Sequence, residues 1–92
     1  MREMIWRFEI TARAEQDISQ LDAFVARRIK EKLTWFAENF EVTVHFPLSG
    51  EQGGTFKLRV GDWRIFYIVD NPARVAYIMA VEHRSKAYKK HR

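Results

Sequence analysis

The 92-residue sequence contains no cysteine, which excludes disulfide bonds and thiolate metal sites. It has no apolar run close to the roughly 20 residues that a membrane-spanning helix needs. Charged residues interrupt the N-terminal segment at once, so it contains no apolar stretch typical of a signal peptide. We therefore expect a cytoplasmic protein without a membrane partner, folded as one domain over residues 1–92.

Paired catalytic carboxylates, clustered metal-ligating residues and a glycine-rich phosphate loop are also absent from the sequence. This pattern disfavours two-metal nucleases and enzymes that use nucleoside triphosphates. We expect neither a metal nor a cofactor.

Acidic residues are scarce in the C-terminal part of the chain. Residues 1–54 carry seven Lys/Arg and nine Asp/Glu, whereas residues 55–92 carry nine and three, so the two parts carry −2 and +6. Such a basic segment indicates a polyanionic partner, either a nucleic acid or an acidic protein segment, although a solvated basic surface would have the same composition.

The N-terminal half predicts one strand and two helices. Alternating apolar residues indicate a first strand: Met4, Trp6, Phe8 and Ile10. Thr11 can cap a short helix that ends at about Leu21, and Asp22 can cap a second, longer helix. Apolar residues recur at spacings of three and four in the second helix: Val25, Ile29, Leu33, Phe36 and Phe40. Its opposite face is charged: Arg27, Arg28, Lys30, Glu31 and Glu38.

The C-terminal half predicts three strands, at residues 55–60, 62–69 and 75–81. A loop precedes them at residues 41–54, within which Val42, Val44 and Phe46 alternate as a candidate edge segment. Residues 70–72 form a turn, and residues 85–92 form a short helix or a frayed tail. The element order predicts an α+β domain in which the helices pack on one face of a sheet.

The hairpin at residues 56–67 concentrates positive charge. Gly61 and Asp62 suit a two-residue turn of type II′ or I′, which would pair Arg59 with Arg64. Strand alternation then places Lys57, Arg59 and Arg64 on the face opposite the apolar side chains. Like charges directly opposite each other destabilise a sheet, so stability does not explain the two arginines. A phosphate site would explain them, because arginine presents a rigid donor fork to phosphate oxygens, but side chains splayed into solvent remain an alternative.

A second polar cluster follows the last predicted strand. Helical geometry would place Arg84 and Tyr88 on one face, and His83 is a candidate for proton transfer because histidine is the commonest general acid or base. Each of these residues, taken alone, is more often an ordinary surface residue.

Residues 57–67 (KLRVGDWRIFY), followed by residues 81–84 (VEHR) and Tyr88, closely resemble the motif of the RelE/ParE toxin superfamily. The upstream strand and two helices agree, so the resemblance covers nearly the whole chain. The hairpin motif is fairly specific for the superfamily but separates its branches poorly. The resemblance implies a RelE-like fold and the toxin of a type II toxin–antitoxin pair, with a cognate antitoxin as partner and operator DNA bound only through the complex.

In RelE-type members, the resemblance implies metal-independent cleavage of mRNA on the ribosome, by attack of a 2′-hydroxyl on the adjacent phosphate. On this model Arg64 stabilises the developing charge and Arg84 acts on the phosphate and leaving group. Lys57 matches a lysine that transfers protons, and Tyr88 matches a tyrosine that orients the nucleotide. The further candidate RNA contacts are Arg59, Lys86, Lys89 and Lys90.

The sequence departs from this pattern at Thr55, where the superfamily's other strand lysine would stand. Thr55 is not an effective base, so His83 is a candidate to share the acid–base role, and the assignment stays open. ParE-type toxins, which inhibit DNA gyrase by binding, are the alternative, and Tyr88 favours the RelE type over them. A basic RNA-binding module without catalysis is the third possibility.

Overall fold

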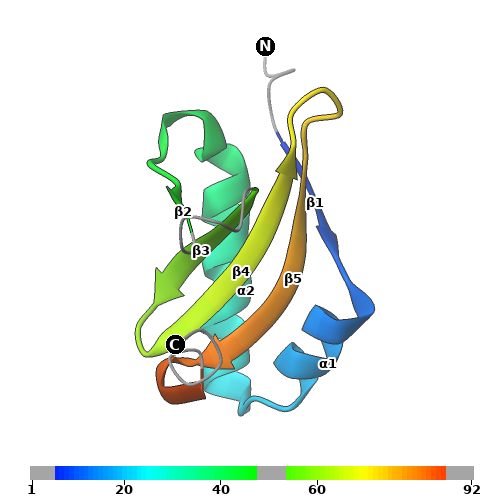
Figure 1. The fold of residues 1–92 in the computed structure, drawn as a ribbon. Helices are drawn as coiled ribbons and strands as arrows, with labels where there is room; N and C mark the ends of the chain where they lie inside the picture. Colours follow the sequence, from blue (N-terminus) through cyan, green and yellow to red (C-terminus); the bar gives the residue numbers. More distant parts are fainter. Residues whose placement is uncertain (1–5, 48–53, 87–92) are drawn as a thin grey trace.

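The computed structural model describes residues 6–47 and 54–86 (Figure 1). Its elements, in chain order, are β1 (Arg7–Ile10), α1 (Ala12–Ser19), α2 (Ala23–Glu38), the 3-10 helix η1 (Phe40–Val42), β2 (Phe46–Pro47), β3 (Thr55–Val60), β4 (Trp63–Asp70) and β5 (Val75–His83). Residues 84–86 begin a helical turn after β5. No helix in the described ranges is long and apolar enough to cross a membrane.

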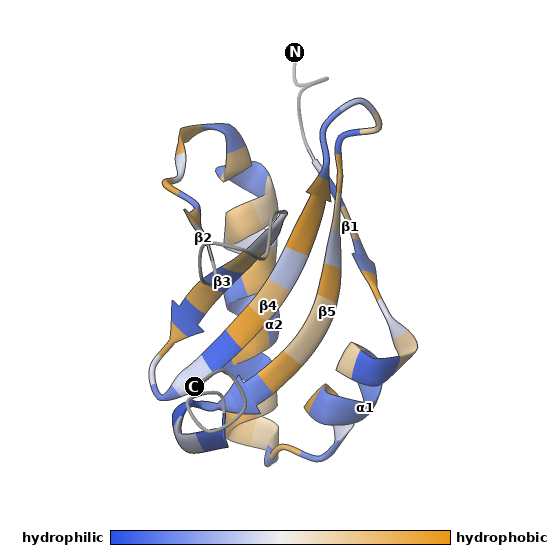
Figure 2. Ribbon diagram, in the orientation of Figure 1, coloured by the Kyte–Doolittle hydropathy of each residue, from blue (hydrophilic) through white to orange (hydrophobic). Residues whose placement is uncertain are grey.

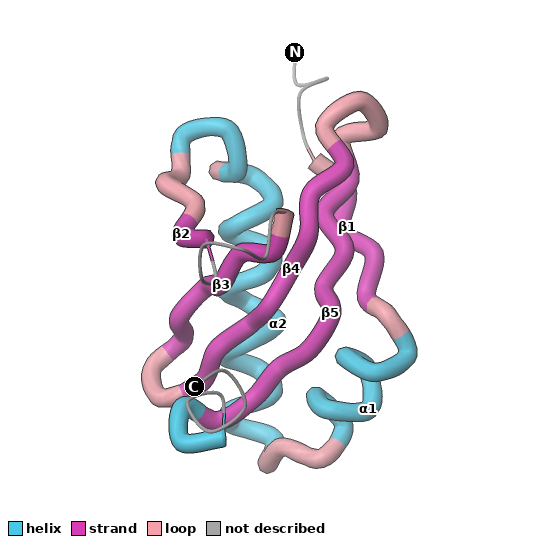
Figure 3. The backbone as a smooth tube through the Cα atoms, in the orientation of Figure 1, coloured by secondary structure: helices cyan, strands magenta, loops and turns pink. Residues whose placement is uncertain are grey.

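The strands form one sheet in the order β1-β5-β4-β3-β2. Strands β2 to β5 are antiparallel to their neighbours, whereas β1 pairs with β5 in parallel. Helix α2 runs along one face of the sheet, and α1 lies beside β5 (Figures 1 and 3). Side chains of both helices contribute to one buried core with the strands. The expected α+β architecture, with an N-terminal strand, two helices and a three-stranded meander, is confirmed.

Local hydrogen bonds begin both helices at the expected caps. The Thr11 hydroxyl accepts from the Ala14 N–H at 3.2 Å, and the Asp22 carboxylate accepts from the Val25 N–H at 3.0 Å. The helix ends were predicted too late, because α1 stops at Ser19 and α2 at Glu38. Phe40 therefore reaches the core from η1 and not from α2.

Several strand boundaries also differ from the predictions. β4 spans Trp63–Asp70, and β5 extends two residues further than expected, to His83. The candidate edge segment forms a strand only at Phe46–Pro47, because Val42 belongs to η1. The two additional residues of β5 pair with the start of β4, Glu82 with Arg64 and His83 with Trp63.

An aromatic cluster fills the core between α2, η1 and the sheet. The ring of His45 lies against Phe36 and Phe40, with centroids 5.6 and 4.2 Å away. Its Nδ1 is 2.6 Å from the Tyr67 hydroxyl and its Nε2 is 3.0 Å from the Phe40 carbonyl. Since the carbonyl can only accept, Nε2 carries a proton in this arrangement, and in a neutral ring Nδ1 accepts from Tyr67. Burial raises the pKa of Tyr67 above its usual range, so the phenol remains a donor.

A second contact joins three segments at the β4–β5 turn. One oxygen of Glu41 accepts from the Trp6 indole at 2.8 Å and from the Arg74 guanidinium at 2.9 Å. Arg74 also has a positive φ of 57° and accepts through its carbonyl from the Arg7 N–H. This contact connects the start of β1 with η1 and with the turn between β4 and β5.

The Tyr67–His45 hydrogen bond is testable by removing one oxygen atom. We expect Tyr67→Phe to lower the free energy of unfolding by about 1 to 3 kcal/mol, because the half-buried imidazole of His45 loses a hydrogen-bond partner. Urea denaturation at neutral pH measures the change. Tyr77→Phe is the matched control, since Tyr77 lies outside the aromatic cluster. Equal stability of the Tyr67→Phe and wild-type proteins would exclude a structural role for this bond.

Candidate functional site

The β3–β4 hairpin forms in the predicted register. Val60 pairs with Trp63, Arg59 with Arg64, and the pairing continues to Thr55 opposite Ile68. Gly61 has a φ of 61°, and Asp62 is not among the residues with positive φ, which is the pattern of type II′ rather than I′. A Cβ at Gly61 would lie 3.4 Å from Nη1 of Arg28 in α2, so the turn sits close to this helix.

The register separates apolar and basic side chains as expected. The side chains that pack with the core are Phe56, Leu58, Val60, Trp63, Ile65 and Tyr67. The opposite face carries Lys57, Arg59 and Arg64, which we call the basic face. Lys57 and Arg59 are exposed and Arg64 is half-buried. Hydrophilic residues accordingly gather at the β3–β4 turn end of these strands (Figure 2).

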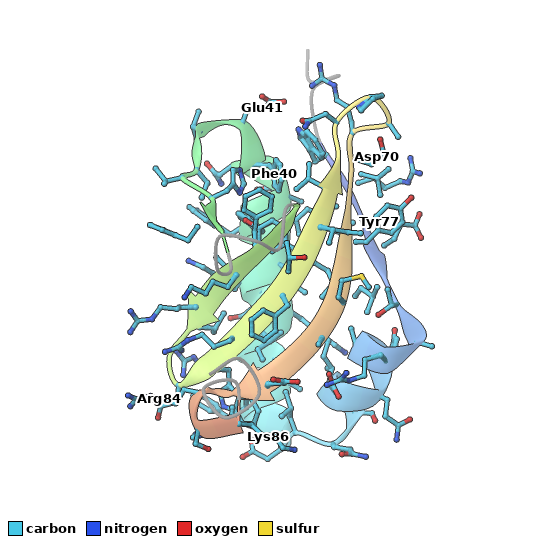
Figure 4. All side chains as sticks on the ribbon, viewed as in Figure 1. Phe40, Glu41, Asp70, Tyr77, Arg84 and Lys86 are labelled. Carbon is cyan, nitrogen blue, oxygen red and sulfur yellow. The ribbon has the colours of Figure 1, made fainter. Side chains whose placement is uncertain are left out.

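Backbone contacts position two arginines around the turn. Nη1 of Arg64 donates to the carbonyl oxygens of Gly61 and Trp63, at 3.3 and 3.2 Å. The Arg84 N–H donates to the Asp62 carbonyl at 2.8 Å. Figure 4 accordingly places Arg84 beside the hairpin turn. The backbone of Arg84, at the end of β5, therefore lies against the hairpin turn.

His83 is not brought to the basic face. Ile78 pairs with Tyr67 and Ala80 with Phe66, so Met79 is an extra residue that shifts the register. The shift reverses the alternation beyond it, and His83 pairs with Trp63, with ring centroids 5.1 Å apart. His83 consequently lies on the face that carries Trp63, away from Lys57, Arg59 and Arg64.

The same shift places Glu82 on the basic face, which the sequence did not predict. Glu82 pairs with Arg64 across β4 and β5, and it is only 6% exposed. It is the single buried charged residue in the described part of the chain. In the sequence, Glu82 is marked only by its place within the motif at residues 81–84. Its burial depends on the bulge in β5 and on the packing of α1, whose Arg13 contacts Glu82.

Three candidate residues, Tyr88, Lys89 and Lys90, lie outside the described residues. Lys86 is exposed within the turn that follows β5, at the same end of the sheet as Arg84 (Figure 4). The described site is therefore a basic face with Arg84 at its border and a buried carboxylate beside Arg64.

A sheet with these two helices and a basic hairpin is the arrangement expected for the RelE/ParE toxin class, and the comparisons with known proteins agree. A family model described as the ParE toxin of the type II toxin–antitoxin system parDE matches residues 8–88. Toxin RelG of Mycobacterium tuberculosis is 30% identical over 84 residues, which cover 91% of this chain and 94% of that protein. The chain therefore belongs to the ParE toxin family, within the RelE/ParE superfamily, and is a type II toxin.

Solved structures share the fold. The toxin–antitoxin complex RelBE2 of Mycobacterium tuberculosis contains a chain with a TM-score of 0.76 and 26% identity, covering 86% of this chain and 98% of that one. The isolated RelE toxin of E. coli has a TM-score of 0.70 at 20% identity, covering 92% and 97%. The predicted superfamily is thus confirmed.

The two opposed arginines generate a prediction about stability. We expect Arg59→Gln to raise the free energy of unfolding by about 0.2 to 1 kcal/mol, because it removes repulsion between directly opposite charges. Urea denaturation in low salt measures the gain, which should shrink in 0.5 M salt as screening increases. Arg27→Gln removes an exposed arginine from α2 as a control. A loss of stability in Arg59→Gln would show that the pair is not strained.

Proposed function

We propose that the protein is a ribosome-dependent mRNA endonuclease that uses the 2′-hydroxyl of its substrate as nucleophile. The main support is the basic face, where Arg59 and Arg64 stand directly opposite each other with Lys57 beside them. Like charges directly opposite each other destabilise a sheet, whereas arginine side chains can donate two parallel hydrogen bonds to a phosphate. The likeness to Toxin RelG supports the RelE branch of the superfamily.

The reaction needs little from the protein, because RNA supplies both the nucleophile and the leaving group. The 2′-oxygen loses its proton to a base and bonds to phosphorus, and the bond from phosphorus to the 5′-oxygen breaks. The 5′-oxygen takes a proton, so the products are a 2′,3′-cyclic phosphate and a 5′-hydroxyl. Arg64 and Arg84 stabilise the charge that develops on the phosphate, without a metal or a cofactor.

Lys57 is the proposed group for proton transfer, since it lies exposed on the basic face. Thr55, at the start of the same strand, cannot replace a second lysine. The placement of His83 against Trp63 removes support for its predicted acid–base role. Tyr88 is proposed to orient the nucleotide, and Lys86, Lys89 and Lys90 to contact the RNA backbone.

A cognate antitoxin is the proposed partner in the cell, as in the RelBE2 complex of Mycobacterium tuberculosis and the intact E. coli RelBE complex. The η1–β2 segment offers it an apolar surface, because Val42, Val44 and Phe46 are 81, 69 and 60% exposed. An antitoxin that also covers the basic face would block RNA, and operator DNA would be bound only through the complex.

Inhibition of DNA gyrase is the second candidate function, and the match to the ParE family model favours it. The basic face could bind an acidic protein surface as well as a phosphate. The two functions differ in chemistry, because gyrase inhibition requires binding alone.

Arg64 provides the first functional test. We expect Arg64→Ala to fold normally and to cut ribosome-bound mRNA about 10²–10³ times more slowly, because one preorganised donor to the phosphate is lost. Single-turnover cleavage on programmed ribosomes gives the rate, and growth arrest on induction gives the effect in cells. Arg27→Ala, which removes an exposed helix arginine, is the matched control. An Arg64→Ala protein that cuts at the wild-type rate would remove Arg64 from the site.

Tyr88 separates the two candidate functions. If the protein is a nuclease, Tyr88→Ala should bind ribosomes normally and cut slowly, since the ring orients the nucleotide. Wild-type protein should leave 2′,3′-cyclic phosphate ends on ribosomal mRNA and cut free mRNA poorly. Gyrase supercoiling should proceed in its presence. Equal toxicity of the wild-type and Tyr88→Ala proteins, together with inhibition of supercoiling by both, would establish the gyrase reading instead.

A further inference from the structure

Phe46 carries an exposed aromatic ring at the edge of the sheet. Its side chain is 60% exposed, and its strand, β2, is the outermost one beside β3 (Figure 1). The other exposed aromatic residues in the described ranges, Phe24 and Trp35, belong to α2. Phe46 is therefore the exposed aromatic residue that the sheet itself supplies.

The strand register places this ring on the basic face. Phe46 pairs directly with Lys57 across β2 and β3. Directly opposed residues of two strands project their side chains to the same side of the sheet, so Phe46 shares the basic face with Lys57. The preceding residue agrees with this placement. The ring of His45 packs in the core against Phe40, and successive side chains along a strand point to opposite faces.

The cations of the basic face lie immediately beside Phe46. Lys57 is its direct partner, and Arg59 lies two residues further along β3, opposite Arg64. Lys57 also pairs with Phe66 on its other side, but Phe66 is 6% exposed, so little of its surface can meet a ligand. Phe46 therefore offers the accessible ring next to Lys57.

A ring beside several cations matches the way in which proteins hold single-stranded RNA. The cations bind phosphates and the rings stack on bases, and such stacking tolerates any sequence because every base has a π-face. The Cβ atoms of directly opposed residues are about 4.5–5.5 Å apart. A nucleotide whose phosphate lies at Lys57 can therefore place its own base, or the adjacent one, on the ring of Phe46.

We propose that Phe46 is an RNA-binding residue, on whose ring a base next to the cleaved bond stacks. The inference rests on the proposed function, because it takes mRNA as the ligand of the basic face. It adds to the site a residue of β2, a strand that contributes nothing to the motif at residues 57–67.

A contact with the antitoxin alone is the competing explanation for the exposed ring. Val42 and Val44 are also exposed, and such an apolar surface suits a protein segment. On that explanation, cutting of mRNA in the absence of antitoxin does not depend on Phe46. Stacking on RNA instead requires the ring itself, and it requires a base at one defined position of the mRNA.

The experiment measures single-turnover cleavage of mRNA on programmed ribosomes without antitoxin. It compares wild type with Phe46→Leu, which removes the ring but keeps an apolar side chain, and with Phe46→Tyr, which keeps the ring. Val44→Ala is the matched control, since Val44 is an exposed apolar residue of the same segment without a ring. Each protein is tested on intact mRNA and on three mRNAs that lack one base at the cleaved site, where an abasic ribose keeps the 2′-hydroxyl and the phosphate.

We expect Phe46→Leu to cut intact mRNA about 5- to 100-fold more slowly, the range expected for the loss of one stack between a base and a ring. Phe46→Tyr and Val44→Ala should stay within about twofold of wild type, because neither loses that stack. On one of the abasic mRNAs, wild type and Phe46→Leu should cut at equal rates, since the stacked base is already missing. The same factor for Phe46→Leu on all four mRNAs, or no slowing at all, would overturn the inference.

Two controls keep the outcome interpretable. Circular dichroism establishes that each variant is folded, and Phe46→Met, which also lacks a ring, takes the place of Phe46→Leu if that protein is unfolded. Absence of cutting by the wild-type protein on every mRNA would contradict the proposed function. Wild-type cutting that is insensitive to the ring at position 46 would overturn this inference alone, so the two failures are distinguishable.

Discussion

The pairing of β4 with both of its neighbours is the constraint on which the rest of the structure depends. β4 lies between β3 and β5, and its register decides which side chains meet α2 and which face away from the helices. Because side chains alternate along a strand, a slip by one residue would turn Arg64 into the core and expose Ile65. The type II′ turn at Gly61 fixes the register between β3 and β4. The extra residue at Met79 fixes the register between β4 and β5.

The two ends of the sheet differ in the interactions that their side chains make. At the β4–β5 turn, Glu41 connects Trp6 with Arg74, and His45 completes an aromatic cluster with Tyr67 nearby. At the β3–β4 turn, Trp63 lies against His83, and backbone carbonyl oxygens accept hydrogen bonds from Arg64 and Arg84. The hydrogen bond of His45 with Tyr67 and the ion pair of Glu41 with Arg74 thus lie at the end of the sheet opposite the paired Arg59 and Arg64. This separation allows the like charges at the site to be tolerated.

Helix α1 connects the core with the basic face. Its apolar residues Ala14 and Ile18 are buried in the core, while Arg13 and Asp17 reach the end of β5. Helix α1 therefore contacts both the apolar and the charged parts of β5.

The sequence by itself determined the features that depend on near neighbours. The caps Thr11 and Asp22, the apolar stripe of α2 and the hairpin pairing follow from contacts within a few residues, and the structure confirms them. The tertiary structure decided the parallel pairing of β1 with β5, the burial of Glu82 and the face of His83. Strict alternation from Ile78 would have placed His83 on the same face of the sheet as Arg64, but the bulge at Met79 moves it to the opposite face. Such a bulge depends on how β5 fits β4 and α1, and those partners are distant in sequence.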